Sequence, residues 1–599
     1  MKMGLNIKIK RTNLVVIFTV LVIVLFLSSL FHRISYPLIW NDEGETAIYG
    51  QRILQYGYPK IDDGKNRIFL SWQPDRTLGI KKSNDAYIFT TWSQYYLAAL
   101  GVYFGKSHIN LYQKTALLRI PFAAIGLLGL FLFVLCLRLV LKNGIQRRIA
   151  ILLFLFFELI SISLVLHLRE ARYYSIIIFL TALIFYLYIQ YRIVNQISYS
   201  RFLIGMTISL ILYYHTYFTG YFVLMSFFIC YECLLAFQKW ILGKKEIGGT
   251  PSRRLKNPSI GHFGKRFLPY VLSLILLIPS FIYFDMYNVL TQISNTIPLG
   301  LKGYQKNLVF IFSFFIRYDI FYLILFVKIL YLLFRRLKAK NPIPEFMNKM
   351  AMVSNLFLCF FLYNVLATAK MPFLFERYFI NLQPVLAGMA TLDIIFVWHC
   401  IALKWPQAQS RRMHWAFAVL LVGILTVNGF RQKAIFKGFI TEKVVKYRGP
   451  LDFMIPFIQQ QCANSEDLVV ATNYEECSFI YYLNCRILIG YNYDNVIRDA
   501  QERPDIIIYR KKWKWLHDPD VFNDYLKKEQ YICIRFPVYD YPVNNIPELN
   551  FHIGHLFETL YTPDLGLQTK LFIKKSLFKP GRKSSIPYMI DNTNRFSVE

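Results

Sequence analysis

The sequence predicts a mainly α-helical, polytopic membrane protein of about eleven transmembrane helices, with a C-terminal α/β domain outside the cytoplasm. Hydrophobic residues make up 55% of the 599 residues and charged residues only 17%, a balance typical of integral membrane proteins. Apolar runs of about 20 residues, the length that spans a bilayer, recur through most of the first part of the chain. Basic residues gather in alternate loops between these runs.

The first apolar run, residues 12–31, follows the basic stretch KIKR and lacks a small-residue cleavage site before the next polar loop. We therefore expect an uncleaved first transmembrane helix and not a signal peptide. The other expected spans are apolar runs of similar length. They lie near residues 117–141, 149–167, 173–191, 202–217, 218–238, 267–284, 310–334, 348–369, 377–399 and 413–430.

The net charge of +32 gathers in short loops between the spans, such as KNGIQRR, RRLKAK and LKWPQAQSRR. If the N-terminus is cytoplasmic, these loops all face the cytoplasm, which is the positive-inside pattern. Nucleic-acid binding is therefore not expected. The segment 87–105 is apolar and aromatic, but counting it as a span would turn the later basic loops outward. We expect an interfacial helix there.

After residue 430 the sequence becomes polar and mixed, with no further run of membrane length. We expect a transmembrane domain of residues 1–430, whose first extracytoplasmic loop spans 32–116, and a separate extracytoplasmic domain of residues 431–599. DLVVAT, CRILIGY and PDIIIYR are typical of strands and NYEECSFIYYLN of a helix, which predicts an α/β layer with some parallel pairing. Four cysteines in this domain permit two disulfides in an oxidising compartment.

A group of acids follows the first span in WNDEGETAIYG, where Asp42, Glu43 and Glu45 lie near the start of an expected helix. Capping explains two of them, because Asp42 can cap the helix and Glu45 completes a capping box three positions later. Capping does not require Glu43, a second carboxylate where the helix dipole favours the ionised form. An ionised carboxylate at the outer face of a membrane is a suitable general base for a hydroxyl acceptor.

A second charged cluster lies at the outer end of the third span, in HLREARYYS. It brings Arg169, Glu170 and Arg172 together. Positive charge is expected on the cytoplasmic side, so this arrangement indicates a local anionic partner such as Glu170 or a phosphate. The structural alternative is a helix-end ion pair anchored by the tyrosines that follow.

A third cluster, in AKMPFLFERYFINLQP, offers Lys370, Glu376, Arg377 and Tyr378 at another outer edge. Snorkelling with an interfacial ion pair is the alternative explanation. Together the three clusters bring carboxylates that can activate a hydroxyl, and basic groups that can hold a phosphate, to one side of the membrane. They predict a sugar donor carried on a polyprenyl phosphate, because nucleotide sugars are absent outside the cytoplasm.

The chain resembles the GT-C superfamily of membrane glycosyltransferases, in the group of the protein O-mannosyltransferases and the lipid A aminoarabinose transferases. The similar stretches occur in the family's order over most of residues 10–400. They are NDEGETAIYGQRILQYGYP, ALLRIPFAAIGLLGL, HLREARYYS, YYHTYFTGYFVL and FERYFINLQPVLAG. The resemblance implies a GT-C-like fold and transfer of a sugar from a polyprenyl-phosphate donor to a hydroxyl of a lipid, glycan or protein outside the cytoplasm.

The resemblance also implies roles for single residues. Asp42 matches the residue that acts as base for the acceptor hydroxyl in the family. Glu43 matches an acid that helps to bind the acceptor or a metal ion. Glu170 matches a position that is often Asp in the family. A divalent metal ion held by Asp42 and Glu170 is left open. The donor phosphate is expected to meet four residues, Arg172, Lys370, Arg377 and Tyr378. Three more are expected to support the site, Arg169, His215 and Tyr217.

The expected reaction is direct displacement at the anomeric carbon, which inverts it. Asp42 would take the acceptor proton while Arg377 stabilises the leaving phosphate. Two alternatives are a flippase or transporter of a lipid-linked sugar and a polymerase or ligase of surface polysaccharide. Transporters commonly carry inverted repeats and broken helices near the middle of the bilayer, and the sequence shows no repeat. The sugar and the acceptor do not follow from the sequence.

Overall fold

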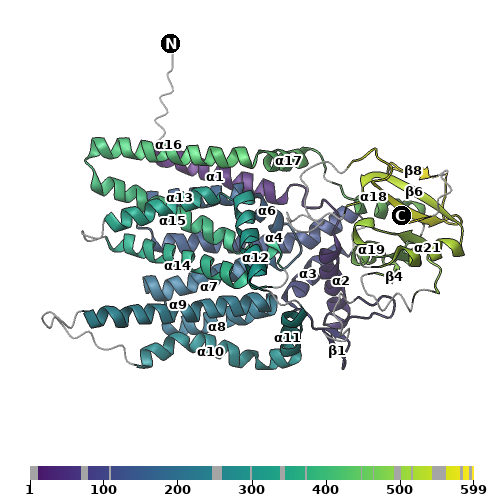
Figure 1. Ribbon diagram of the computed structural model, residues 1–599, viewed down its shortest axis with the longest axis horizontal. Coiled ribbons are helices and arrows are strands. Elements are labelled where there is room, and N and C mark those ends of the chain that lie inside the picture. Colours follow the sequence, from purple (N-terminus) through teal and green to yellow (C-terminus); the bar gives the residue numbers. More distant parts are fainter. Residues whose placement is uncertain are drawn as a thin grey trace, which may run out of the picture.

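The protein has a bundle of long helices joined end to end with a smaller domain built on a β-sheet (Figure 1). The computed structural model describes residues 11–68, 79–106, 110–142, 144–245, 260–296, 300–337, 344–371, 374–446, 448–462, 464–490, 499, 501–514, 517–541, 561–580, 584–591 and 597–598.

The bundle consists of long apolar helices and two short helical turns that connect them. Its elements are α1 (Arg11–Phe31), α4 (Leu111–Val140), α5 (Gly144–Ile160), α6 (Ile162–Leu168), α7 (Tyr174–Ile189), the π-helix η1 (Gln190–Val194), α8 (Tyr199–Thr216), α9 (Phe218–Lys245), α10 (Ile260–Tyr283), α13 (Phe321–Leu337), α14 (Glu345–Thr368), the 3₁₀ turn η3 (Glu376–Phe379), α15 (Leu382–Lys404) and α16 (Gln407–Arg431).

Shorter elements lie where the bundle meets the C-terminal domain. They are α2 (Asn41–Tyr56), the strands β1 (Ile80–Lys81) and β2 (Ala86–Tyr87), α3 (Ser93–Gly105), α11 (Met286–Thr296), α12 (Leu301–Tyr318) and α17 (Lys433–Val444). The expected interfacial segment 87–105 contains α3, which has 13 residues. At 1.5 Å per residue α3 is about 20 Å long, too short to cross a hydrocarbon core.

In the part of the chain that the structure describes, eight helices are long and apolar enough to cross a membrane, or up to ten if each of two bent pairs forms one span. The bent pairs are α5 with α6, at 80°, and α12 with α13, at 99°. The expected spans 149–167 and 310–334 fall on these pairs, so neither is one straight helix. In Figure 1, α12 runs across the direction of the long helices. The count of eleven spans stays a prediction.

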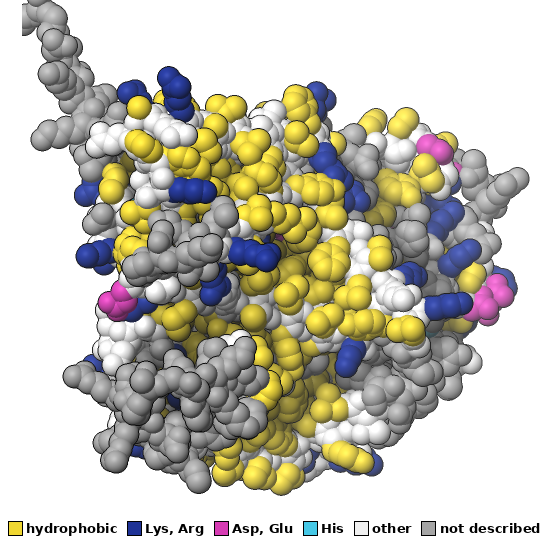
Figure 2. All heavy atoms as spheres, turned by 60° about the vertical axis from the view of Figure 1, so that its left-hand side comes forward, with side chains coloured by type: hydrophobic (Ala, Val, Ile, Leu, Met, Phe, Trp, Pro, Cys, Tyr) yellow, Lys and Arg dark blue, Asp and Glu magenta, His cyan; other side chains and the backbone are white. Residues whose placement is uncertain are grey.

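The outer surface of the bundle is apolar. Figure 2 shows a broad band of hydrophobic side chains across the helical part of the molecule. Helix α1 illustrates its origin, because Val20, Val24 and Leu25 are all exposed large apolar side chains. Exposed side chains of this kind, repeated around the long helices, are those of a protein whose surface faces lipid. The chain is therefore an integral, multi-pass membrane protein.

The C-terminal domain confirms the predicted α/β layer. Its elements are α18 (Leu451–Gln461), β3 (Val469–Thr472), α19 (Glu476–Leu483), β4 (Arg486–Ile489), β5 (Ile506–Ile508), η4 (Lys511–Trp513), α21 (Pro519–Lys528), β6 (Tyr531–Tyr539), β7 (Gln568–Lys574) and β8 (Met589–Asp591). The described strands form a six-stranded sheet in the order β4-β3-β5-β7-β6-β8. Strand β3 pairs in parallel with β4 and β5, and the remaining pairings are antiparallel.

The C-terminal domain packs directly on α2, the helix that carries the acidic group. A Cβ atom on Gly44 would lie 2.8 Å from the Cβ atom of Cys477 in α19, so the two helices touch where only glycine fits. The Ser478 hydroxyl donates to the carbonyl of Ile39 at 2.7 Å. Cys477 is a buried free thiol, as are Cys485 and Cys533. The start of α2 is therefore fixed by contacts from both parts of the molecule.

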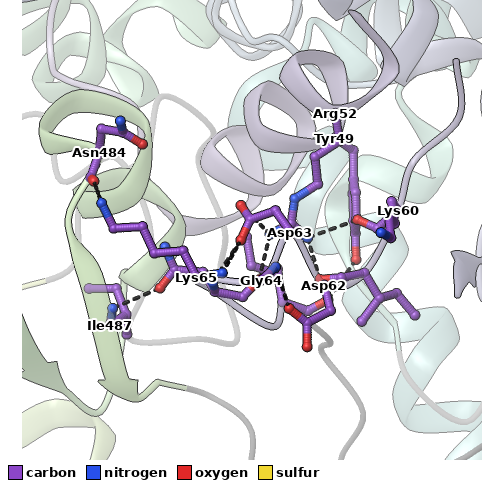
Figure 3. A network of polar contacts seen from close by, with 12 residues as sticks. Tyr49, Arg52, Lys60, Asp62, Asp63, Gly64, Lys65, Asn484 and Ile487 are labelled. Atoms are coloured by element: carbon purple, nitrogen blue, oxygen red, sulfur yellow. Dashed lines mark hydrogen bonds and ion pairs between the residues drawn. The ribbon is translucent and has the colours of Figure 1, made fainter. Parts of the chain in front are cut away.

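A loop before β1 makes a second connection between the two parts (Figure 3). Arg52 of α2 binds the Asp63 carboxylate at 3.0 Å, and that carboxylate also accepts from the backbone N–H groups of Lys65 and Asn66. The Lys65 ammonium group then reaches the carbonyl of Asn484 beside β4. These contacts attach one end of β4 to the helix that begins at the candidate site.

Candidate active site

Helix α2 begins one residue before the acids. Trp40 is its N-cap residue, it makes no side-chain capping hydrogen bond, and Asp42 and Glu43 lie in the first turn. The interpretation of Asp42 as the helix cap is therefore wrong, since its side chain lies inside the helix and not before it. Both carboxylates are next to the positive end of the helix dipole.

Glu43 forms a fully buried ion pair that the sequence did not predict. Both of its carboxylate oxygens accept from the Arg119 guanidinium group of α4, at 2.8 and 2.6 Å, and the residue is 0% exposed. The Ala171 N–H group donates to the same carboxylate at 3.0 Å. Arg119 also donates to the carbonyls of Ile34 and Pro37. This pair fixes α2, α4 and the turn before α7 to one another.

Asp42 points to a different place, between two arginines. Its Oδ2 atom lies 3.2 Å from Nη1 of Arg377 and 3.6 Å from Nη2 of Arg172. Its side chain is 18% exposed, unlike that of Glu43. The structure thus brings together three predicted site residues from the start of α2, the turn before α7 and η3. Asp42 is the acid of this group that a substrate can reach.

Arg172 joins the acids of α2 to one another. Its Nη1 atom donates to the Asp42 carbonyl at 2.8 Å and to the Thr46 hydroxyl at 3.0 Å, and it lies 3.5 Å from Oε2 of Glu45. The Tyr95 hydroxyl donates to Oε1 of Glu45 at 2.9 Å. Burial raises the pKa of Glu45, and the charge of Arg172 opposes this rise. The Nη1 atom of Arg172 is therefore engaged by α2, whereas its Nε–H group has no hydrogen-bond partner among the described residues.

A pocket opens beside Arg377, between the start of α9 and the end of α14. Its empty space, including the part open to solvent, is about 320 Å³. Arg377, Tyr378, Tyr217, Asn364 and Thr368 are among the residues that line it. The pocket thus combines one guanidinium group with aromatic and amide side chains at the edge of the helical bundle.

Stacked tyrosines form one wall of this region. The rings of Tyr173 and Tyr217 stack at a centroid distance of 5.2 Å, and the rings of Tyr217 and Tyr378 at 6.0 Å. The Arg377 guanidinium group lies 4.0 Å from the centroid of the Phe375 ring. Aromatic faces beside a cation suit a sugar ring or an isoprenoid chain next to a phosphate.

The other predicted site residues lie around this centre at differing distances. Glu170 is fully buried, and Arg169 turns toward Arg33, whose carbonyl it binds at 2.6 Å. His215 is paired with the Ser280 hydroxyl of α10 at 3.2 Å. Lys370 is exposed between two pocket residues, Thr368 and Met371. The ion pairs with the Asp42 carboxylate are made by Arg172 and Arg377.

The acids present do not fit a metal site. Among the described residues there is no group of three or more His, Cys, Asp and Glu side chains placed to hold a metal ion. Both oxygens of Glu43 are engaged by Arg119, and Asp42 lies against two guanidinium groups.

The sequence matches no known protein-family model and no curated protein sequence. Among solved structures, ArnT from Cupriavidus metallidurans in the apo state is 11% identical and aligns with a TM-score of 0.51, over 95% of this chain and 99% of that chain. This likeness confirms the expected GT-C-like fold.

Two further structures align less closely. ArnT from the same organism bound to undecaprenyl phosphate has 12% identity and a TM-score of 0.49, over 95% of this chain and 100% of that chain. The Archaeoglobus fulgidus oligosaccharyltransferase in the apo form has 11% identity and a TM-score of 0.42, over 87% of this chain and 73% of that chain.

Proposed function

We propose that the protein is an inverting membrane glycosyltransferase. It moves a sugar from a polyprenyl-phosphate-linked donor to a hydroxyl of a lipid, glycan or protein acceptor. The observation that carries this proposal is the placement of Asp42 3.2 Å from Arg377 at the edge of a pocket. One group can accept a proton and the other can hold a phosphate, and these are the two functions that the transfer needs. The fold shared with apo ArnT supports the same kind of protein.

On the acceptor side, Asp42 is the general base. It removes the proton from the acceptor hydroxyl as the oxygen attacks the anomeric carbon of the sugar. The ion pair of Glu43 with Arg119 holds the first turn of α2 in place behind Asp42. We therefore assign Glu43 a positioning role in place of the expected contact with acceptor or metal.

On the donor side, Arg377 stabilises the phosphate that leaves. Negative charge grows on the phosphate oxygen as the bond to the sugar breaks, so a fixed cation there lowers the barrier. Arg377 is paired with Asp42. A bound phosphate competes for this guanidinium group and frees Asp42 to take a proton, so we expect the donor to bind first.

The orientation of the bundle supports an active site outside the cytoplasm. Helix α16 begins at the end of the bundle remote from the C-terminal domain, and its first turns contain Arg411 and Arg412 (Figure 1). Positive charge at that end marks the cytoplasmic side. Asp42 and Arg377 lie at the opposite end, next to the C-terminal domain.

The variant Asp42→Asn tests the assignment of the base. It keeps the shape of the side chain but removes the proton acceptor, so turnover should fall by about 10²–10⁴-fold. Donor binding should be kept, because Arg377 remains. Both are measured on purified protein with a panel of polyprenyl phosphate sugars, after mass spectrometry of the copurifying lipid.

The same variant separates the alternatives. A flippase should be little affected by Asp42→Asn, whereas a transferase loses turnover. A polysaccharide polymerase or ligase would use an undecaprenyl pyrophosphate glycan instead of a monosaccharide donor. Full transfer activity in Asp42→Asn would rule out Asp42 as the base.

A further inference from the structure

A second basic cluster lies outside the candidate active site. Its members are Arg33, just after α1, Arg169 in the turn before α7, and Lys443 in the last turn of α17. These three elements are far apart in the sequence and meet at the end of the bundle next to the C-terminal domain. We refer to the three residues as the seam cluster.

The cations of the seam cluster bind main-chain carbonyl groups. Arg33 donates to the carbonyls of Glu442 and Val444 at 3.2 and 2.8 Å. Lys443 donates to the carbonyl of Ser29 at 2.5 Å, and Arg169 to that of Arg33 at 2.6 Å. Carbonyl groups hold the side chains in place but carry no net charge. The acid that acts on both Arg169 and Lys443 is Glu442, a single carboxylate beside three basic side chains.

Two arginines of the active site are balanced by carboxylates. Arg119 and Arg377 pair with the carboxylates of Glu43 and Asp42. In the seam cluster, by contrast, Arg169 is only 5% exposed, and its Nε–H group has no hydrogen-bond partner among the described residues. A buried guanidinium group with an unused donor is costly unless an acceptor is supplied from outside. The seam cluster thus has an open position for an anion.

The charges of the seam cluster also act on one another. Burial lowers the pKa of Lys443, the nearby charges of Arg169 and Arg33 act in the same direction, and Glu442 opposes them; together they bring this pKa to about 6. The protonated form of Lys443 is therefore disfavoured in the protein alone. An anion bound between these groups would restore that proton and balance the positive charge.

The position of the seam cluster points to a lipid headgroup. It lies at the ends of two candidate membrane spans, because Arg33 follows α1 and α17 follows α16. Ile440 and Val444 of α17 are 61% and 73% exposed. Exposed apolar side chains beside basic ones are typical of a helix that lies in the membrane interface. The anion that is available at this interface is the charged headgroup of a membrane lipid.

We propose that Arg33, Arg169 and Lys443 bind the phosphate group of an anionic membrane lipid, whose acyl chains lie against the apolar side of α17. Each of the three side chains contributes a donor to the phosphate oxygens, and guanidinium groups match phosphate geometry well. The basic residues here are on the side of the membrane where the positive-inside pattern does not place them, and a lipid phosphate gives them a function. The proposal does not depend on the transferase activity.

The test compares two lipids that differ in headgroup charge. Full-length protein in a neutral detergent is titrated with short-chain phosphatidylglycerol or phosphatidylcholine, and the thermal unfolding midpoint is recorded. Phosphatidylglycerol should raise the midpoint, and phosphatidylcholine should not. In Arg33→Gln and Lys443→Gln, the concentration needed for half of the rise should increase about fivefold or more. Glutamine keeps an N–H donor for the carbonyl groups but removes the charge.

Two controls keep the result specific. Lys437→Gln removes the same charge from an exposed position of α17, and its half-point should change less than twofold. Arg33→Lys keeps the charge and should bind nearly as well as the natural protein, which also separates lost binding from lost folding. An equal rise with phosphatidylcholine, an equal loss in Lys437→Gln, or the same rise from inorganic phosphate at equal concentration would overturn the proposal.

Discussion

At the scale of single residues, the adjacent acids Asp42 and Glu43 differ because of what surrounds them. Glu43 is buried with both oxygens bound to Arg119. Replacing one partner leaves the other charge buried and unpaired, which costs about 3–5 kcal/mol. We therefore expect Glu43→Gln to lower the stability of the protein strongly, measured by denaturant or thermal unfolding in detergent.

A surface ion pair provides the control for this variant. Glu345 binds Lys349 one turn later at 2.8 Å, and its side chain is 83% exposed. Glu345→Gln should leave the unfolding transition unchanged, because solvent and salt screen such pairs. Equal stability of Glu43→Gln and the natural protein would show that the pair with Arg119 does not hold α2 in place.

The sequence predicted some residues of the candidate site and not others. Asp42, Arg172 and Arg377 were predicted because charged residues at the outer ends of apolar runs stand out from their surroundings. The pairing of Glu43 with Arg119 was not predicted, since the partners are 76 positions apart. A signal was present, because Arg119 is a charged residue within an apolar run and such residues seek a partner. A single sequence does not say which partner.

At the scale of elements, the contact between α2 and α19 depends on Gly44. An added Cβ atom would lie 2.8 Å from the Cys477 Cβ atom and 2.9 Å from the backbone nitrogen of Ser478. Gly44→Ala should therefore push the helices apart and destabilise their contact by about 1–3 kcal/mol. The effect can be measured as earlier unfolding of the C-terminal domain, followed by limited proteolysis.

Gly423→Ala is the matched control, since nothing lies within 4 Å of a Cβ atom added to this residue of α16. Alanine is a better helix former than glycine, so this variant should be as stable as the natural protein or slightly more so. The prediction for Gly44 fails if both variants unfold alike.

The sequence predicted the elements better than their geometry. The strands β3, β4 and β5 and the helix α19 were expected from short apolar runs. Some parallel pairing was expected too, and the structure shows it between β3 and β4. The bends between α5 and α6 and between α12 and α13 were not expected. The hydrophobic periodicity is nearly the same on both sides of such a bend. A continuous apolar run therefore predicts one straight helix where the structure has two.

At the scale of the whole molecule, the first polar loop joins the helical bundle to the C-terminal sheet. Strand β4 is at one edge of that sheet. The Asn66 amide donates to the Cys485 carbonyl at 2.9 Å, and its oxygen accepts from the Ile487 N–H group at 2.8 Å. Asn66 thus satisfies polar groups of β4 that would otherwise lack a strand partner.

Asn66→Ala should loosen this connection. The Cys485 carbonyl and the Ile487 N–H group would both lose their partner in a buried place, which costs about 1–3 kcal/mol. Hydrogen exchange at the Ile487 amide should therefore become about tenfold faster or more. Lys65→Ala, which removes an exposed side chain of the same loop (Figure 3), should change that exchange much less. Unchanged exchange at Ile487 in Asn66→Ala would mean that other contacts hold the two parts of the molecule together.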